Sequence, residues 1–272
     1  MAHNNPCVHF VRAETSLFED VSYDVSIDNT NQYPVHPLHS VESKTAPIQF
    51  DIKGNDVNYL NFAESKLYIR CKIVDKNLGD IPYEADKTKS AYAPVNNFLH
   101  SMFESVSMSI NDTEITQFSK YYPYRSYIET LLMKGKDYKK SVGQATCFYK
   151  TKDESIVSDP GWEARMNLVD RSAVFEMIGR PHIDLLQQMK FIPPGVDVKL
   201  TFNRSPDAFC IQTAGTNPPS DLQVQILEAQ FIVTKHTLLN SVLMNQIKTW
   251  NSGKPAAYPM REIQLKTYNL PT

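Results

Sequence analysis

The side chains of this chain that could carry out chemistry are its histidines, lysines and cysteines. His36 and His39 have the spacing of a metal-binding pair. However, Pro37 lies between them and prevents the helix that would align their rings. A structural metal site needs four protein ligands, and no second ligand cluster follows in the sequence. We therefore expect these two histidines to bind no metal.

The other histidines do not predict catalysis. His100, His182 and His236 lie near no serine or cysteine nucleophile motif, and the sequence contains no G-x-S-x-G, phosphate-loop or H-E-x-x-H pattern. The whole chain has nine glycines, which makes a glycine-rich phosphate cradle a poor expectation. We expect no enzymatic activity, no cofactor and no catalytic residue.

The densest charge lies at residues 134–140, which contain Lys134, Lys136, Lys139 and Lys140. A run of this kind is most often a solvated helix end, and otherwise a patch that faces an acidic neighbour or nucleic acid. The net charge of −2 gives the chain no global basic field, so strong direct binding of nucleic acid is not expected. The four lysines are candidate interface residues.

The cysteines and the hydropathy of the chain indicate in which cellular compartment the protein is expected. Cys7, Cys71, Cys147 and Cys210 form no C-x-x-C pair. Three of the four lie within apolar or strand-like stretches, which predicts buried free thiols and suits a reducing compartment. The first residues lack a basic region followed by an apolar core, so no secretory signal is expected. No uncharged run approaches the roughly 20 apolar residues of a membrane span.

Strict alternation of apolar and polar residues is the main structural signal. It predicts strands with one buried face, which are typical of antiparallel sheets in a sandwich or barrel. Asn111-Asp112 separates two of these segments and predicts a tight hairpin. The predicted strands cover residues 48–52, 67–73, 106–110, 113–118, 196–202, 222–233 and 263–268. The side chains expected to pack the sandwich are Phe98, Leu99, Phe103, Val106, Met108, Ile110, Val198 and Leu200.

One amphipathic helix is predicted between Pro123 and Gly135, because apolar residues recur there at helical spacing. We expect this stripe to dock the helix, through Tyr124, Tyr127, Ile128 and Leu131. A weaker helical segment is predicted at 181–189.

Several motifs, in order, carry a resemblance to a known family. They read "GNDVNYLNFAESKLYIRCKI", "APVNNFLHSMFESVSMSIND", "YYPYRSYIETLL", "GRPHIDLLQQMKFIPPGVDVKLTFNRSPDAFCI" and "YPMREIQLKTYNLP". Over roughly residues 40–272 the chain resembles the double jelly-roll major capsid proteins of Polinton/Maverick elements and their adintovirus relatives. It is more distantly similar to capsid proteins of large eukaryotic DNA viruses.

The resemblance implies an all-β fold in which an antiparallel jelly-roll sandwich carries a short helix in a loop. The expected organisation is an N-terminal arm at 1–45, a jelly roll at 46–236, and a linker with the start of a second jelly roll at 237–272. The implied function is that of a major capsid subunit, which forms homotrimers and then the lattice of an icosahedral virion. Penton or minor capsid proteins are the other implied partners. Assembly would take place in the host cytoplasm or nucleus.

Two other functions fit the same residues. A host-domesticated, capsid-derived β-sandwich could bind carbohydrate or protein, although two tryptophans are few for a lectin-like groove. A cupin-like enzyme would need clustered histidine and carboxylate ligands on inward-facing strand positions, whereas the seven histidines are scattered.

Overall fold

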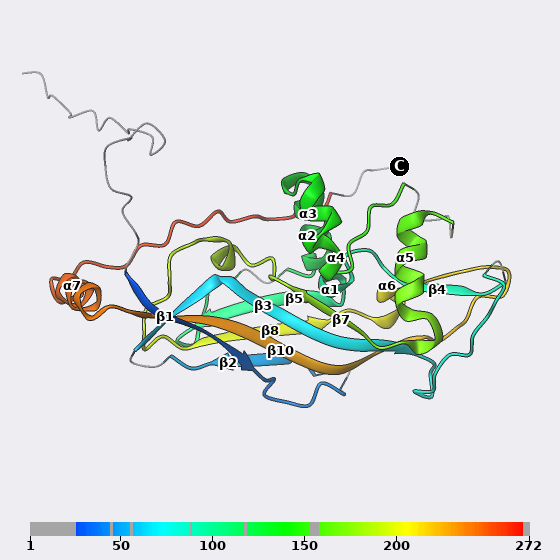
Figure 1. Ribbon diagram of the computed structural model, residues 1–272, viewed down its shortest axis with the longest axis horizontal. Helices are drawn as coiled ribbons and strands as arrows, with labels where there is room; N and C mark the ends of the chain where they lie inside the picture. Colours follow the sequence, from blue (N-terminus) through cyan, green and yellow to red (C-terminus); the bar gives the residue numbers. More distant parts are fainter. Residues whose placement is uncertain are drawn as a thin grey trace, which may run out of the picture.

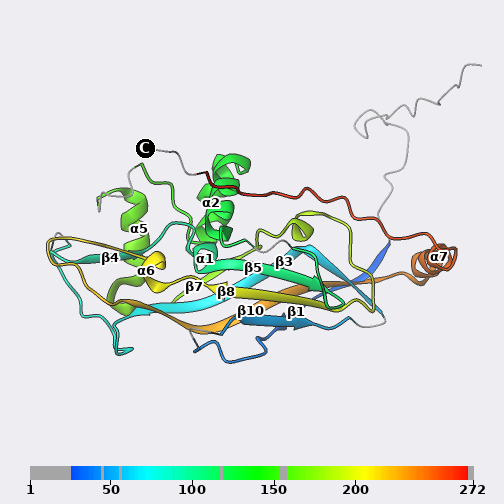
Figure 2. The same cartoon turned by 180° about the vertical axis from the view of Figure 1, so that it is seen from behind.

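The computed structural model describes residues 26–43, 46–54, 57–87, 89–116, 119–152 and 158–268. In this part of the chain, two four-stranded antiparallel sheets pack face to face (Figures 1 and 2). The first sheet has the order β1-β10-β3-β7, formed by Ile27–Val35, Gln223–Leu238, Asn58–Val74 and Phe175–Gly179. The second has the order β2-β8-β5-β6, formed by Ile48–Ile52, Val198–Arg204, Phe103–Ile110 and Thr113–Glu114.

This strand order is that of a jelly roll. Along the chain the sheet strands alternate between the two layers, except that β5 and β6 are neighbours in one hairpin. The first and last strands pair with each other, as do β2 and β8, which is the nested pairing of a double-sheet jelly roll. The predicted fold class is therefore confirmed. A separate two-stranded ribbon joins β4 (Ala91–Pro94) and β9 (Ile211–Ala214).

The alternating residues face each other across the sandwich. In β2, Ile48, Phe50 and Ile52 are buried while the residues between them are half-buried. The Phe50 ring lies 5.8 Å from that of Phe202 in its own sheet and 6.0 Å from that of Phe231 in the opposite sheet. Aromatic contacts of this kind bury large apolar areas and join the two layers.

The side chains expected in the core lie there with one exception. Ile110 is only partly buried, because it ends β5 next to the hairpin. The other seven are all buried: Phe98, Leu99, Phe103, Val106, Met108, Val198 and Leu200.

The expected boundary between an arm and the jelly roll at residue 46 is wrong. Residues 27–35 form β1, which pairs with β10 from Ile27 opposite Leu238 to Val35 opposite Phe231. β1 is largely exposed and has no apolar alternation, so it is held by backbone pairing rather than by buried side chains. Among the described residues the jelly roll thus begins at Ile27.

The Asn111-Asp112 hairpin is confirmed. Both residues have positive φ, at 45° and 61°, as a two-residue type I′ turn requires. The second predicted strand is shorter than expected, since β6 ends at Glu114.

The predicted helix after Pro123 is α2, Tyr122–Met133. The segment at 181–189 contains only a 3-10 turn, η3, at Asp184–Gln187. Another 3-10 turn, η2, lies at Asp170–Ser172. The helices that the sequence analysis missed are α1, α3, α4, α5, α6 and α7, at Phe98–Ser101, Lys136–Lys140, Val142–Ala145, Pro160–Val169, Asp207–Cys210 and Asn240–Asn251.

After α7 the chain returns over the sandwich as an extended segment. Figures 1 and 2 show it passing along the side from which α2 and α5 rise. The predicted strand at 263–268 joins no sheet in the structure, and only Ile263 and Leu265 of that stretch are half-buried. Within the described ranges no helix is long and apolar enough to cross a membrane.

Candidate assembly surface

The outstanding surface feature of the molecule is helix α2, which stands upright on the sandwich (Figure 1). Pro123 occupies its first turn, where a missing N–H costs no hydrogen bond. The helix ends at Lys134, which is extended, and Gly135 follows. Leu131, Leu132 and Met133 favour helical structure, so the segment is helical for local reasons.

The two faces of α2 are reversed relative to an ordinary surface helix. The face toward the sandwich carries Tyr122, Ser126, Glu129 and Thr130, all of them buried. The apolar stripe faces outward, with exposed fractions of 52% for Tyr124, 40% for Ile128, 43% for Leu131 and 79% for Leu132. Tyr121, just before the helix, extends the stripe at 38% exposed.

The prediction that the apolar stripe docks the helix is therefore wrong for Ile128 and Leu131, while the rings of Tyr124 and Tyr127 contact those of Phe209 and Phe148. Of the four residues, Tyr127 alone is half-buried, with its ring centroid 5.8 Å from that of Phe148. Tyr124, Ile128 and Leu131 are exposed instead. The physical reason is that polar partners on neighbouring elements satisfy the buried side of α2, so a polar face can be buried without leaving unpaired groups.

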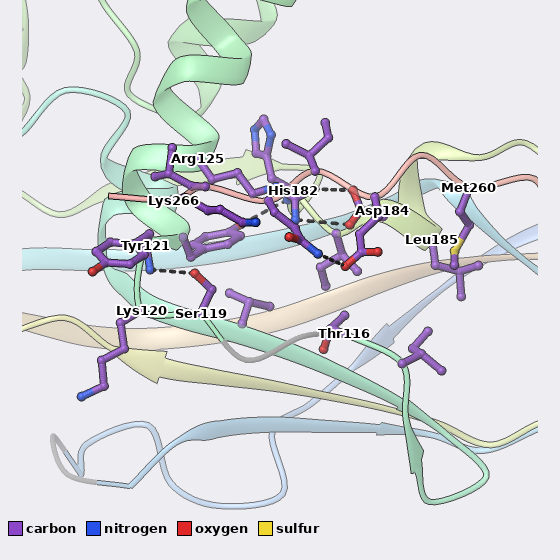
Figure 3. A pocket seen from close by; sticks show the side chains of 18 residues that line it. Thr116, Ser119, Lys120, Tyr121, Arg125, His182, Asp184, Leu185, Met260 and Lys266 are labelled. Carbon is purple, nitrogen blue, oxygen red and sulfur yellow. Dashed lines mark hydrogen bonds and ion pairs between the residues drawn. The ribbon is translucent and has the colours of Figure 1, made fainter. Parts of the chain in front are cut away.

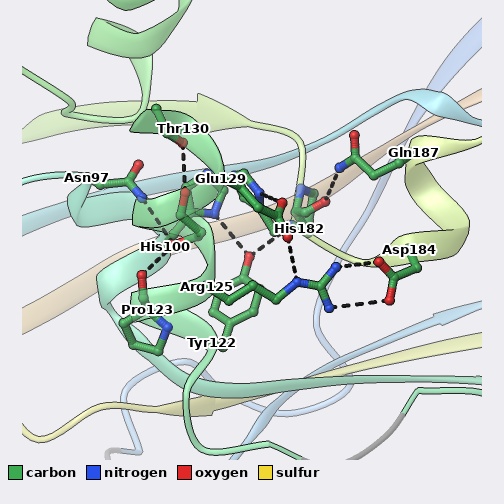
Figure 4. A network of polar contacts seen from close by, with 12 residues as sticks. Asn97, His100, Tyr122, Pro123, Arg125, Glu129, Thr130, His182, Asp184 and Gln187 are labelled. Carbon is green, nitrogen blue, oxygen red and sulfur yellow. Dashed lines mark hydrogen bonds and ion pairs between the residues drawn. The ribbon is translucent and has the colours of Figure 1, made fainter. Parts of the chain in front are cut away.

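Figure 4 shows the polar cluster that provides these partners. Arg125 donates a hydrogen bond to Glu129 on α2 at 2.7 Å and forms a bidentate ion pair with Asp184. Glu129 also accepts a hydrogen bond from Nδ1 of His182 at 2.5 Å. Bidentate arginine–carboxylate pairs fix orientation as well as distance. The cluster thus fixes the first two turns of α2 against the loop at 182–184.

A second set of hydrogen bonds joins α2 to α1 and the residue before it. The Tyr122 hydroxyl lies 3.0 Å from Nδ1 of His100 and accepts the backbone N–H of His182 at 3.2 Å. The Asn97 amide donates to the Ser126 hydroxyl at 3.1 Å. The His100 and His182 rings meet edge to face, 4.7 Å apart.

Burial controls the charges in this cluster. Burial acts to raise the pKa of Glu129, but the hydrogen bonds from His182 and Arg125 outweigh it and lower the pKa below its usual value. Burial, together with the neighbouring His182, holds the pKa of His100 well below its usual value, so this ring is neutral. Burial raises the pKa of Tyr122, so its hydroxyl stays protonated. Glu129 is therefore an ionised acceptor paired with the Arg125 guanidinium, while His100 and Tyr122 nearby are neutral.

A cleft of about 570 Å³ lies beside the cluster (Figure 3). Its walls include Tyr121, Arg125 and Asp184, and Met260 and Lys266 of the extended C-terminal segment line its other side. Tyr121 and Thr267 lie within hydrogen-bonding distance, 3.2 Å between their hydroxyl oxygens. Arg125 and Asp184 neutralise each other, and Lys120, Glu262 and Lys266 also line the cleft.

The remaining candidate residues lie apart from this cluster. His36 and His39 are exposed, and His236 is buried in β10 between Thr30 and Asn61. Among the described residues no three histidine, cysteine or carboxylate side chains are placed to hold a metal ion. Cys71, Cys147 and Cys210 are buried free thiols, and Cys7 lies outside the described residues.

The four candidate interface lysines follow directly at the end of α2. Lys136, Lys139 and Lys140 belong to α3, and Lys134 lies between the two helices. Lys139 caps the Leu131 carbonyl at 2.8 Å, and the Lys134 ammonium lies 5.0 Å from the centre of the Tyr138 ring. In the part of the chain that the structure describes, none of the four forms an ion pair.

The sequence analysis missed the residues that hold α2 in place. Arg125 and Glu129 have the i, i+4 spacing of a helical ion pair, which was a local signal for one contact. The contribution of Asp184 and His182 had no such signal, because they are more than fifty residues away.

Comparison with known proteins supports the fold. No protein-family model matches the chain. An uncharacterized protein of Caenorhabditis elegans is 23% identical over 240 residues, which is 88% of this chain and 56% of that protein. The chain thus spans about half the length of the curated relative that it matches.

Solved structures of viral capsids have a similar fold. A quasi-atomic model of the PBCV-1 virus capsid matches 84% of this chain and 46% of that chain, with a TM-score of 0.50 and 11% identity. The mavirus major capsid protein matches 87% of this chain and 52% of its own, with a TM-score of 0.44 and 9% identity. The chain therefore shares the jelly-roll fold of the PBCV-1 capsid structure.

Proposed function

We propose that this chain is a structural subunit of a viral capsid, of the Polinton/Maverick type of double jelly-roll major capsid protein. The observation that carries the proposal is the strand order β1-β10-β3-β7 over β2-β8-β5-β6, shared in fold with the PBCV-1 capsid structure. The outward-facing apolar stripe of α2 supports it, because monomeric proteins rarely expose a contiguous apolar patch without a binding role.

The proposed assembly is a homotrimer that acts as a pseudo-hexagonal capsomer of an icosahedral shell. Penton or minor capsid proteins would be further partners, and the protein would be located in the virion after assembly in the host cytoplasm or nucleus. The protein would act by shape and by contacts rather than by turnover of a substrate. The buried polar cluster then has a structural role, since it fixes α2 on the rigid sandwich.

We also propose that residues 237–272 lead from the first jelly roll into a second one. The "YPMREIQLKTYNLP" motif supports this, together with the extended course of residues 258–268. Ile263 and Leu265 alternate with exposed residues there, as in a strand with one buried face.

The test is the state of association of the purified 272-residue chain. Size-exclusion chromatography with light scattering should find a species of about 93 kDa, three times the 31.0 kDa chain, and negative-stain electron microscopy should find larger assemblies at high concentration. A protein that stays monomeric over the whole accessible concentration range would contradict the proposal.

A second candidate function is a host-domesticated, capsid-derived binding module. The match to a Caenorhabditis elegans protein favours it, because that relative comes from an animal. This function predicts a monomer that binds a carbohydrate or protein in one concave site. Glycan-array binding by a strictly monomeric protein would support it over the capsid function.

A further inference from the structure

The exposed side of α2 carries an apolar surface that the described chain covers only in part, through Thr267 at 3.2 Å from the Tyr121 hydroxyl and Phe209 with its ring centroid 5.8 Å from that of Tyr124. The assembly stripe, as we name it, consists of Tyr121, Tyr124, Ile128, Leu131 and Leu132. These residues recur at helical spacing, and the buried polar residues of α2 lie on the opposite side of the helix. The tyrosines and aliphatic side chains are of the kind enriched at the centre of protein interfaces.

The helix that carries the stripe is rigidly held. Arg125 and Glu129 tie it to the loop at 182–184, and Tyr122 ties it to His100. A surface whose geometry is fixed before binding loses little conformational entropy on association. The buried hydrogen bonds and ion pairs that hold α2 therefore suit a preformed contact surface.

The charge next to the stripe indicates what binds there. Residues 134–140 contain four lysines and one aspartate, a charge of +3, whereas the whole chain has −2. The rest of the chain therefore has a formal charge of −5, and the lysines have no ion-pair partners among the described residues. Another copy of the same chain offers the carboxylates that this basic end lacks, while free nucleic acid would meet repulsion from the acidic remainder.

We propose that the assembly stripe, with Lys134, Lys136 and Lys140 beside it, is a contact surface for a second copy of this chain. The inference rests on the proposed capsid function and names the surface through which neighbouring copies meet. The basic end on one copy and acidic surface elsewhere on the next make this a head-to-tail contact, the kind that closes into rings.

The size of the stripe fits one contact among several. A helix of 12 residues is about 18 Å long. Its five side chains, each about half exposed, offer on the order of 400 Å², since a large side chain buries roughly 150–250 Å². A stable two-chain interface needs about 800 Å² per partner. The contact is therefore weak alone and gains strength when each copy has several neighbours.

The test uses the full 272-residue chain with the photo-crosslinking residue p-benzoylphenylalanine at position 132. Met189 is a matched control position, because it is 84% exposed against 79% for Leu132 and lies outside the stripe. Irradiation should link position 132 to peptides of a second copy that contain carboxylates, as mapped by mass spectrometry. The same probe at position 189 should give few such links.

A pair of charge substitutions completes the test. Leu132→Glu should weaken association about tenfold or more, whereas Met189→Glu should leave it within about twofold. Circular dichroism should show both variants folded, because both positions are exposed. Association of the unchanged protein should also weaken with added salt, since the lysines contribute to it.

The outcomes separate the two proposals. If the unchanged protein assembles but Leu132→Glu assembles equally well and position 132 forms no link to a second copy, this inference is wrong and the capsid function stands. Crosslinks from position 132 to nucleic acid instead of protein would also overturn it. If the unchanged protein never associates, the capsid function fails, and this inference fails with it.

Discussion

Replacing Glu129 by glutamine would show whether the polar cluster holds α2 on the sandwich. Glu129 is 8% exposed and accepts hydrogen bonds from Arg125 at 2.7 Å and His182 at 2.5 Å. Glutamine keeps the shape and one acceptor oxygen, but its amide presents N–H groups to one of the two donors. At least one charge-assisted hydrogen bond is therefore lost, and Arg125 keeps Asp184 as its counter-charge.

The expected loss can be built from these contacts. A hydrogen bond to a charged group contributes about 1.5–3 kcal/mol, and a buried donor left without a partner costs about 1–3 kcal/mol. Because glutamine retains one of the two bonds, both figures apply to one lost contact, and we expect Glu129→Gln to lower the free energy of unfolding by about 2.5–6 kcal/mol. For a chain of this size the midpoint of thermal unfolding should fall by on the order of 5–20 °C.

The assay is urea unfolding followed by circular dichroism at pH 7, with hydrogen exchange of residues 122–133 as a local measurement. Glu114→Gln is the control, because Glu114 is exposed on β6 and a surface change of this kind stays within about 0.5 kcal/mol. Exchange in α2 should accelerate in the Glu129 variant and not in the control. This locates the loss at the helix rather than in the core.

The pH dependence of the free energy of unfolding gives a second test of the role of Glu129. The pKa of Glu129 is lowered in the folded state, so its contribution is complete above the unfolded value of about 4.5 and is lost as pH falls through the folded pKa. The difference between the unchanged protein and the variant should shrink below pH 4.5. A loss under about 1 kcal/mol at pH 7, or a difference that stays constant down to pH 3, would refute the structural role of the cluster.

Three further predictions follow from buried groups and one turn. Burial and the neighbouring His182 depress the pKa of His100 below 6.5, so the stability contributed by the neutral ring is complete above pH 6.5 and falls as pH drops below it. This group alone lowers the free energy of unfolding by up to about 1.4 kcal/mol per pH unit. Urea unfolding at pH 7.5 and 5.5 should therefore show that the stability of His100→Gln depends less on pH than that of the unchanged protein. Burial raises the pKa of Cys147 and Cys210 to about 12, so both thiols stay protonated and unreactive at pH 8. Peptide mapping after iodoacetamide treatment at pH 8 should find both cysteines unmodified until urea is added. Modification of the native protein would contradict their burial. Asp112 has φ of 61° in a two-residue hairpin turn, where glycine carries no Cβ penalty. Asp112→Gly should therefore raise the free energy of unfolding by up to about 1 kcal/mol, and a loss of stability would mean that the turn has another conformation.

The fold class could be predicted because it depends on local periodicity. Alternation located β2, β5, β8 and β10, and two residues that accept positive φ located the hairpin between β5 and β6. The order of strands in the sheets could not be predicted in this way. β1 shows why: its mostly exposed residues have no pattern, and its place in the first sheet depends on backbone pairing with β10 about two hundred residues later.

The same distinction between local pattern and tertiary contact applies to the candidate surface. The sequence alone determined that residues 122–133 form a helix with an apolar stripe, since 3.6-residue periodicity and Pro123 are local properties. Only the tertiary structure decided which side of that helix faces outward. Asp184, His182 and His100 are distant in sequence, and the fold brings them under α2, where they pair with Arg125, Glu129 and Tyr122. Because buried polar groups are stable wherever their partners are supplied, the polar side turned inward and the apolar side was left largely exposed.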